Sequence, residues 1–253
     1  MELFDHDTLT QKAKSAEYRR IAIIQTILII VGLLLDDVLA FLSLGDLKGY
    51  FLPIHLLMIT SYFFLLWTIL KGLVESRALI MSTFVTLIGV LASFIVLESP
   101  LYFLFPDRVH GLVVGHLLFV VIESFVIVRV FKDVFALRKV TTNNLWGAVS
   151  LLFMFSITFA SIYNIVFLMQ PGCVGLEMRP GFDTFSEALY TSLVAVIGNS
   201  PEYPTVSEFV RDIVTIEGFG GAMYLVVLMG RMIGMATPSP NEPGQKRGHT
   251  RES

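Results

Sequence analysis

Residues 183–204, DTFSEALYTSLVAVIGNSPEYP, decide which kind of fold the chain can adopt. Thr184 and Glu187 have the spacing of a capping box, which is typical of a helix start. The apolar run that follows, residues 188–197, is about 10 residues long, half of the ~20 that a helix needs to cross a bilayer core. Residues 198–201, GNSP, then predict a turn. We therefore expect a helix that enters a membrane and turns back.

Longer apolar runs lie on both sides of this stretch. The chain is 55% hydrophobic and only 15% charged, so it carries more apolar surface than a water-soluble protein could cover. Each run has roughly the 20 residues that a membrane span requires. The six predicted spans are Ile21–Leu44, Pro53–Leu70, Ala78–Leu97, Gly111–Phe131, Leu145–Met169 and Ile213–Ile233.

The positions of the basic residues predict how these spans are oriented. If the N-terminus is cytoplasmic, all but four of the 18 Lys and Arg residues fall on the cytoplasmic side. The positive-inside rule then favours a multi-pass protein of the plasma (inner) membrane with both termini in the cytoplasm. Residues 1–20 lack the apolar core of a signal peptide, so we expect the first span to stay in the mature protein. The four basic residues outside are Lys48, Arg108, Arg179 and Arg211.

Two motifs in the final third of the chain resemble a known family. Residues 187–194, EALYTSLV, resemble the pore helix of the potassium-channel superfamily, and residues 216–231, IEGFGGAMYLVVLMGR, resemble its inner helix. The resemblance implies a voltage-gated-channel-like architecture, in which four identical subunits surround one axis and loop carbonyls coordinate the ion. The predicted fold is an all-α membrane protein with six transmembrane helices plus a re-entrant pore helix.

The same resemblance implies a division of the chain into four parts. Residues 1–20 are a cytoplasmic N-terminal segment, and residues 21–140 form a sensor-like unit of four transmembrane helices. Residues 141–236 form the pore domain, with its outer helix, pore helix, filter and inner helix. Residues 237–253 are polar and rich in proline, so they are expected to be a disordered cytoplasmic tail.

The predicted filter departs from the family's TVGYG pattern. In its place stand Ala195, Val196, Ile197, Gly198 and Asn199, and the loop is about two residues shorter than the family's. One glycine remains, although asparagine also tolerates the left-handed backbone region. Fewer carbonyl sites predict weak ion selectivity, and the loop could instead pack shut and conduct nothing.

Glu202 follows this loop. Copies of its carboxylate from four subunits would form an acidic ring at the pore mouth, where cations would gather.

The last predicted span contains Gly218, Gly220 and Gly221, each of which costs a soluble helix about 1 kcal/mol relative to alanine. They predict a hinge or a close approach to the pore helix, and small-residue packing is the alternative. Glu217, which matches the family's inner-helix glutamate, is expected to brace the pore helix. Further along, Tyr224, Leu228 and Met232 have a spacing that suits either a gate lining or a packing face.

The first four spans lack the charges of a voltage sensor. A sensor needs arginine at every third residue, whereas the fourth span has Arg129 alone, so strong voltage sensing is not expected. Asp36, Asp37 and His116 are expected in the outer half of the membrane. Glu123 lies about 18 Å into its span, near the middle of the membrane. These four residues are candidates for proton sensing, and structural hydrogen bonding is the alternative.

The sequence therefore predicts a homotetrameric, passive cation channel that passes monovalent cations and needs no cofactor or metal. The alternative is a non-conducting, channel-like sensor or partner-binding membrane protein. Enzymatic activity is not expected, since no two histidines share a helix face and Cys173 is the sole cysteine. The net charge of −3 offers no basic face for a nucleic acid, so the expected partners are lipid and further copies of the chain.

Overall fold

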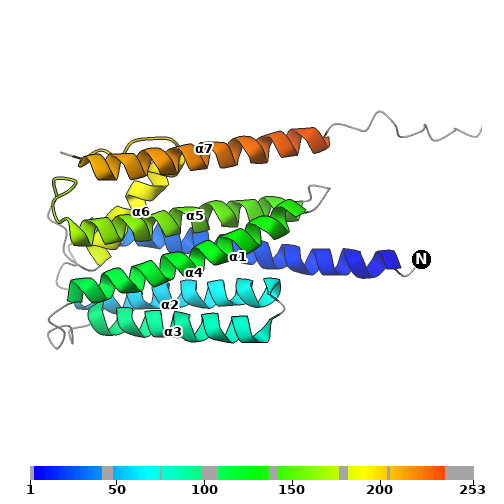
Figure 1. The fold of residues 1–253 in the computed structure, drawn as a ribbon, viewed down its shortest axis with the longest axis horizontal. Coiled ribbons are helices and arrows are strands. Elements are labelled where there is room, and N and C mark those ends of the chain that lie inside the picture. Colours follow the sequence, from blue (N-terminus) through cyan, green and yellow to red (C-terminus); the bar gives the residue numbers. More distant parts are fainter. Residues whose placement is uncertain are drawn as a thin grey trace, which may run out of the picture.

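The computed structural model describes residues 3–41, 48–74, 76–98, 108–136, 142–176, 182–203 and 206–236. These ranges form an all-helical bundle of seven helices, as the sequence predicts. The helices are α1 (Leu3–Phe41), α2 (Lys48–Leu73), α3 (Arg77–Glu98), α4 (Arg108–Ala136), α5 (Thr142–Met169), α6 (Phe182–Val196) and α7 (Glu208–Ala236). In Figure 1 the long helices run along the long axis of the molecule, and the shorter α6 is inclined between α5 and α7.

Five of the described helices are long and apolar enough to cross a membrane. The qualifying stretches are Leu56–Leu73, Arg77–Leu97, Arg108–Phe135, Leu145–Met169 and Glu208–Gly230. They contain most of the second to the sixth predicted spans. The structure is therefore compatible with a membrane protein.

The first predicted span lies at the end of α1. The helix begins at Leu3, so residues 3–20, predicted as a separate N-terminal segment, continue into the span without a break. The span's last residues, 42–44, lie outside the described part of the chain, as does the predicted tail at 237–253. The side chains of Asp36 and Asp37 are also outside it.

The helices differ in how far the rest of the molecule encloses them. In α5, 67% of the apolar stretch is buried, whereas in α7 only 11% of it is buried. Accordingly α5 packs against α4, α1 and α6, and α7 packs mainly against α6 and, less closely, against α5. Thus α5 is the central helix of the bundle, and α7 lies at its edge (Figure 1).

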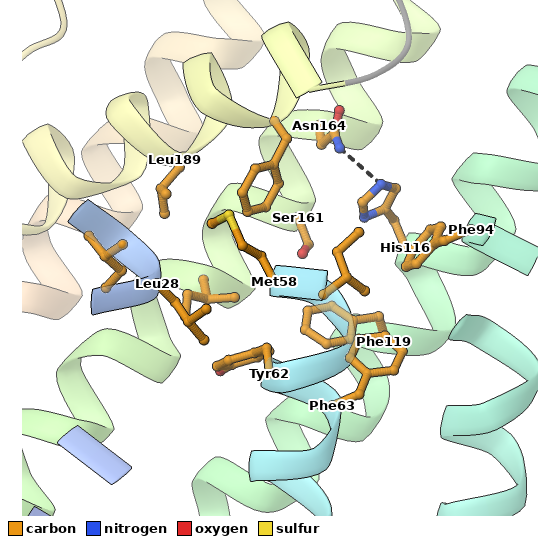
Figure 2. Close-up of a pocket in the computed structure, with 14 residues that line it drawn as sticks. Leu28, Met58, Tyr62, Phe63, Phe94, His116, Phe119, Ser161, Asn164 and Leu189 are labelled. Carbon is orange, nitrogen blue, oxygen red and sulfur yellow. Dashed lines mark hydrogen bonds between the residues drawn. The ribbon is translucent and has the colours of Figure 1, made fainter. Parts of the chain in front are cut away.

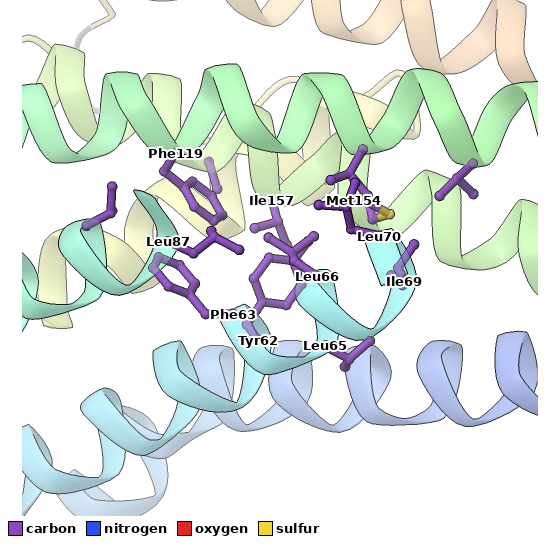
Figure 3. Close-up of a cluster of buried hydrophobic side chains, with 14 of the residues drawn as sticks. Tyr62, Phe63, Leu65, Leu66, Ile69, Leu70, Leu87, Phe119, Met154 and Ile157 are labelled. Atoms are coloured by element: carbon purple, nitrogen blue, oxygen red, sulfur yellow. The ribbon is translucent and has the colours of Figure 1, made fainter. Parts of the chain in front are cut away.

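The main core lies where α2, α3, α4 and α5 meet (Figure 3). The rings of Phe63 and Phe119 stack there with centroids 5.3 Å apart, and Leu66 and Met154 are fully buried beside them. In lipid, such packing stabilises mainly through van der Waals contact, which needs close helix approach. A Cβ added at Gly147 of α5 would lie 2.7 Å from a methyl carbon of Val134 in α4, so glycine permits that approach.

Candidate functional site

The half-length helix predicted from the sequence is α6, which has 15 residues and a rise of about 22 Å, less than a bilayer core. It packs between α5 and α7, with further contacts to α1. Ala188, Ser192 and Ala195 share one face at helical spacing, and all three are buried. The small side chains on this face bring α6 close to its neighbours.

The C-terminal end of α6 is closed by a Schellman motif. Gly198 has a φ of +82°, the left-handed conformation that glycine adopts without strain. Its N–H donates to the Ala195 carbonyl at 2.8 Å, and the Asn199 N–H donates to the Val194 carbonyl at 3.1 Å. Gly198, the one glycine of the predicted filter, therefore ends the helix here, and two carbonyls are satisfied within the chain.

The glycines of α7 lie against the carbonyls at this helix end. A Cβ added at Gly218 would be 3.1 Å from the Ala195 carbonyl oxygen, and one at Gly221 only 2.2 Å from that of Val196. Gly220 instead faces the ring of Phe155 on α5, at 3.0 Å from the added Cβ. The three glycines thus allow α7 to approach α6 and α5 closely, and they lie within one continuous helix.

A buried polar cluster joins α5, α6 and α7 behind this contact. Glu217 of α7 and Ser192 of α6 are fully buried, and the serine Oγ lies 2.5 Å from the glutamate Oε1. The same Oγ lies 2.7 Å from the carbonyl oxygen of Ser156 on α5. Tyr163 is buried beside Glu217. Glu217 therefore contacts α6 from within the bundle, in agreement with the bracing role expected for it from the resemblance.

Beyond the helix end the chain is exposed. Ile197, Gly198 and Asn199 are accessible, and the Ile197 side chain is 62% exposed. Glu202 is exposed as well, whereas the side chains of Ala195 and Val196 are buried. The residues predicted as a filter thus fall into a buried pair facing α7 and an exposed tip.

The residues predicted to line a gate lie nearer the C-terminal end of α7. Tyr224 donates from its hydroxyl to the Ala148 carbonyl of α5 at 2.7 Å. Leu228 is half-buried against the main core, and the side chain of Met232 lies outside the described part. Tyr224 and Leu228 form a packing face toward α5 in the single chain.

A second polar cluster surrounds Glu123 of α4. The carboxyl is fully buried and accepts a short hydrogen bond from the Tyr62 hydroxyl of α2, and Thr158 of α5 lies beside it. Next to Tyr62, Gln25 of α1 accepts a hydrogen bond from Ser150 of α5 at 2.8 Å. Four helices therefore share one polar network in the apolar bundle. Buried groups of this kind are expensive in lipid and must be paired.

His116 lies two helical turns from Glu123 and faces a small cavity (Figure 2). Its ring is 2.9 Å from the Asn164 side-chain nitrogen and packs on Phe94 at a centroid distance of 4.7 Å. The cavity measures about 60 Å³, and its lining is largely apolar, with Ser161 among the polar exceptions. That volume suits a few waters. The side chains of Asp36 and Asp37, the other candidates for proton sensing in the outer half of the membrane, lie outside the described part.

Several of these polar residues were not singled out from the sequence. Gln25, Tyr62, Asn164 and Ser192 all lie in apolar runs, and each makes a buried contact with another helix. The available signal was an amide or hydroxyl within a membrane-length run, which marks a helix contact because lipid offers it no partner.

The described residues contain no group of three or more His, Cys, Asp or Glu side chains able to hold a metal ion. No family model matches the chain, and neither does any curated protein or solved structure.

Proposed function

We propose that this chain is a subunit of a homotetrameric, passive cation channel of the plasma (inner) membrane. The observation that carries the proposal is the arrangement of α5, α6 and α7. A helix too short to cross a bilayer core lies between two that can, and it ends in an exposed turn followed by Glu202. Non-helical backbone at membrane depth is tolerated where it lines a watery path or is buried in protein.

In this proposal α1 also crosses the membrane, which adds a sixth span to the five already described, and α6 is re-entrant. Apolar side chains of α1, including Ile23, Ile27 and Ile30, are exposed, as lipid contact requires. Six crossings return the chain to its starting side. The start of α1 and the end of α7 lie at the same end of the molecule, in agreement with this count (Figure 1). The distribution of Lys and Arg makes that end cytoplasmic.

Oligomerisation is supported by the uncovered face of α7. Ile216, Phe219, Met223 and Val226 follow one another at intervals of three, four and three residues, and each is at least half exposed. This is the spacing of a helix–helix seam. If the α7 helices of several subunits met around an axis, they would cover this stripe. The opposite face of α7 would keep its contact with α6 of the same chain.

The ion path would begin at Glu202 and pass the exposed tip at residues 197–199. The C-terminal end of α6 carries partial negative charge from the helix dipole, which favours a cation. The carbonyls of Ala195 and Val196 face α7, so few backbone oxygens remain to replace an ion's hydration shell. Weak selectivity among cations is therefore the expected behaviour.

The alternative, a non-conducting channel-like sensor or partner-binding protein, is favoured by the same two carbonyls. If their contact with α7 persists in the assembly, and the exposed Ile197 side chains meet at the axis, the tip would be plugged by apolar groups. Such a chain would keep the channel-like arrangement without a continuous path for ions.

The deciding experiment measures potassium, sodium, calcium and chloride flux separately in liposomes that contain the purified protein. We expect cation flux without chloride flux, from particles whose mass corresponds to four chains. Glu202→Gln should lower the cation flux, because the acidic ring is lost. Glu208→Gln removes another exposed carboxylate near this end and should leave the flux unchanged. Intact tetramers without any flux would refute the channel and support the alternative.

A further inference from the structure

A groove runs along the outer face of the bundle between α2 and α3. Its volume is about 170 Å³, larger than the engineered cavity of roughly 150 Å³ that binds benzene in another protein. Its walls are aromatic and aliphatic, and Phe64, Trp67, Phe84 and Ile88 lie along it. The side chains of Phe64 and Ile88 are 65% and 48% exposed, so the groove opens to the lipid and not to another helix.

The groove, together with the turn of helix that leads from it to Lys71, spans about one lipid leaflet. It extends along α2 from Thr60 to Trp67, and Lys71 follows one turn later. At 1.5 Å per residue, the distance from Thr60 to Lys71 along the helix is about 16 Å. Half of a bilayer core is about 15 Å. An acyl chain lying in the groove would therefore extend from the interface to near the middle of the membrane.

The interfacial end of the groove is positively charged. The Lys71 ammonium lies 5.5 Å from the centroid of the Trp67 ring, which lines the groove. Arg77 opens α3 at the same end, and both basic side chains are exposed. Neither has an ion-pair partner among the residues that the structure describes. These two exposed cations near one end of an apolar groove suit an amphiphile with an anionic head.

We propose that this groove binds an anionic phospholipid, with one acyl chain between α2 and α3 and the phosphate at Lys71 and Arg77. The tryptophan ring, set between cation and groove, would lie at the level of the ester region, where amphipathic rings are favoured. This site is separate from α5–α7 and does not depend on conduction.

A comparable cation on α4 provides a matched control. The guanidinium of Arg129 lies 5.1 Å from the centroid of the Phe125 ring, and Lys132 follows it on an exposed face. None of these three residues lines the groove. Replacing both cations of α4 removes the same charge as replacing Lys71 and Arg77, but leaves the groove and its charged mouth intact.

The test is native mass spectrometry of the full chain released from nanodiscs that contain equal amounts of phosphatidylglycerol and phosphatidylcholine with identical acyl chains. We expect the chain to retain phosphatidylglycerol, and the Lys71→Gln/Arg77→Gln variant to bind it about tenfold more weakly. Ile88→Trp, which fills the groove with a side chain that can extend into lipid, should also abolish retention. Arg129→Gln/Lys132→Gln should retain phosphatidylglycerol like the unmodified chain.

Three outcomes would overturn the proposal. Equal loss in the α4 variant would mean that surface charge alone attracts the lipid. Unchanged retention in Ile88→Trp would mean that the groove does not hold a chain. Equal retention of phosphatidylcholine would mean that the cations do not select the headgroup. Circular dichroism and elution volume, measured on every variant, distinguish lost binding from lost folding.

Discussion

The contact between α6 and α7 predicts that Gly221→Ala destabilises the protein. A Cβ at this position would lie 2.2 Å from the Val196 carbonyl oxygen and 2.9 Å from a methyl carbon of the same residue. Contacts below 3.0 Å force a displacement, so α7 would have to move away from α6 by roughly 1 Å or distort. The atoms that the added Cβ would overlap include backbone atoms of Val196, which cannot move aside as the end of a flexible side chain can.

Two opposing contributions determine the size of the effect. Replacing glycine by alanine in a helix gains about 1 kcal/mol of helix propensity. Forcing an extra methyl group into a packed contact costs about 1–3 kcal/mol, and the backbone oxygen at Val196 places this site at the upper end. We therefore expect a net loss of roughly 2 kcal/mol in the free energy of unfolding. If the proposed channel is correct, cation flux should also fall, because the turn after α6 would move.

Other glycines on the same helix provide internal controls. Gly230 has no atom within 4 Å of an added Cβ, so Gly230→Ala should stabilise α7 by its propensity gain alone. Gly218, with its 3.1 Å contact, should fall between the two. Thermal unfolding in detergent, followed by circular dichroism, ranks the three variants. If Gly221→Ala is as stable as Gly230→Ala, the close approach of α6 to α7 does not exist in solution.

Two further predictions concern single polar side chains. Glu217→Ala should lower the thermal unfolding temperature, because the Ser192 hydroxyl loses its carboxyl partner in a dry site. Glu217→Gln keeps a hydrogen-bonding group, so it should lower the unfolding temperature less, and equal decreases in the two variants would refute the bracing role. Burial raises the pKa of the Cys173 thiol above its usual value of 9.0, so less of the reactive thiolate is present at any lower pH. Maleimide labelling of this sole cysteine should therefore be slow near pH 7 and still accelerate above pH 9, whereas protein denatured in dodecyl sulfate should show an ordinary profile; the same profile in both states would contradict the burial.

The sequence was sufficient to predict the helices but not their contacts. Membrane-length apolar runs and the shorter run at residues 188–197 define α2 to α7, because backbone in lipid must satisfy its hydrogen bonds internally. The helix limits were less accurate: α2 begins at Lys48, before the predicted start at Pro53. Pro53 lies inside this helix and removes one intrahelical N–H bond, a loss that membrane helices tolerate where neighbouring groups compensate, so the proline did not mark the boundary.

The candidate site was predicted in part. Glu217 was singled out only because it resembles the inner-helix glutamate of the potassium-channel superfamily, and in the structure its carboxyl contacts Ser192 of α6. The role of Gly198 could not be read from the sequence, since a glycine with positive φ serves a filter loop and a helix cap equally well. Which residues of α1 and α4 share the network around Glu123 depends on helix rotation, and apolar runs facing lipid on one side and protein on the other leave that rotation poorly determined.

The way α6 is held has a consequence for any ion path through this protein. The carbonyls of Val194 and Ala195 accept hydrogen bonds in the Schellman motif, and the glycines of α7 pack closely against the carbonyls of Ala195 and Val196. In the proposed channel, the groups left for an ion would be the exposed backbone of residues 197–199 and the Glu202 carboxylate, which together would make a short coordination site. A filter of stacked carbonyls strips the hydration shell, whereas a short site leaves the ion partly hydrated. If the chain conducts, discrimination should therefore follow charge more than ionic radius, so that sodium and potassium pass at similar rates while chloride is excluded.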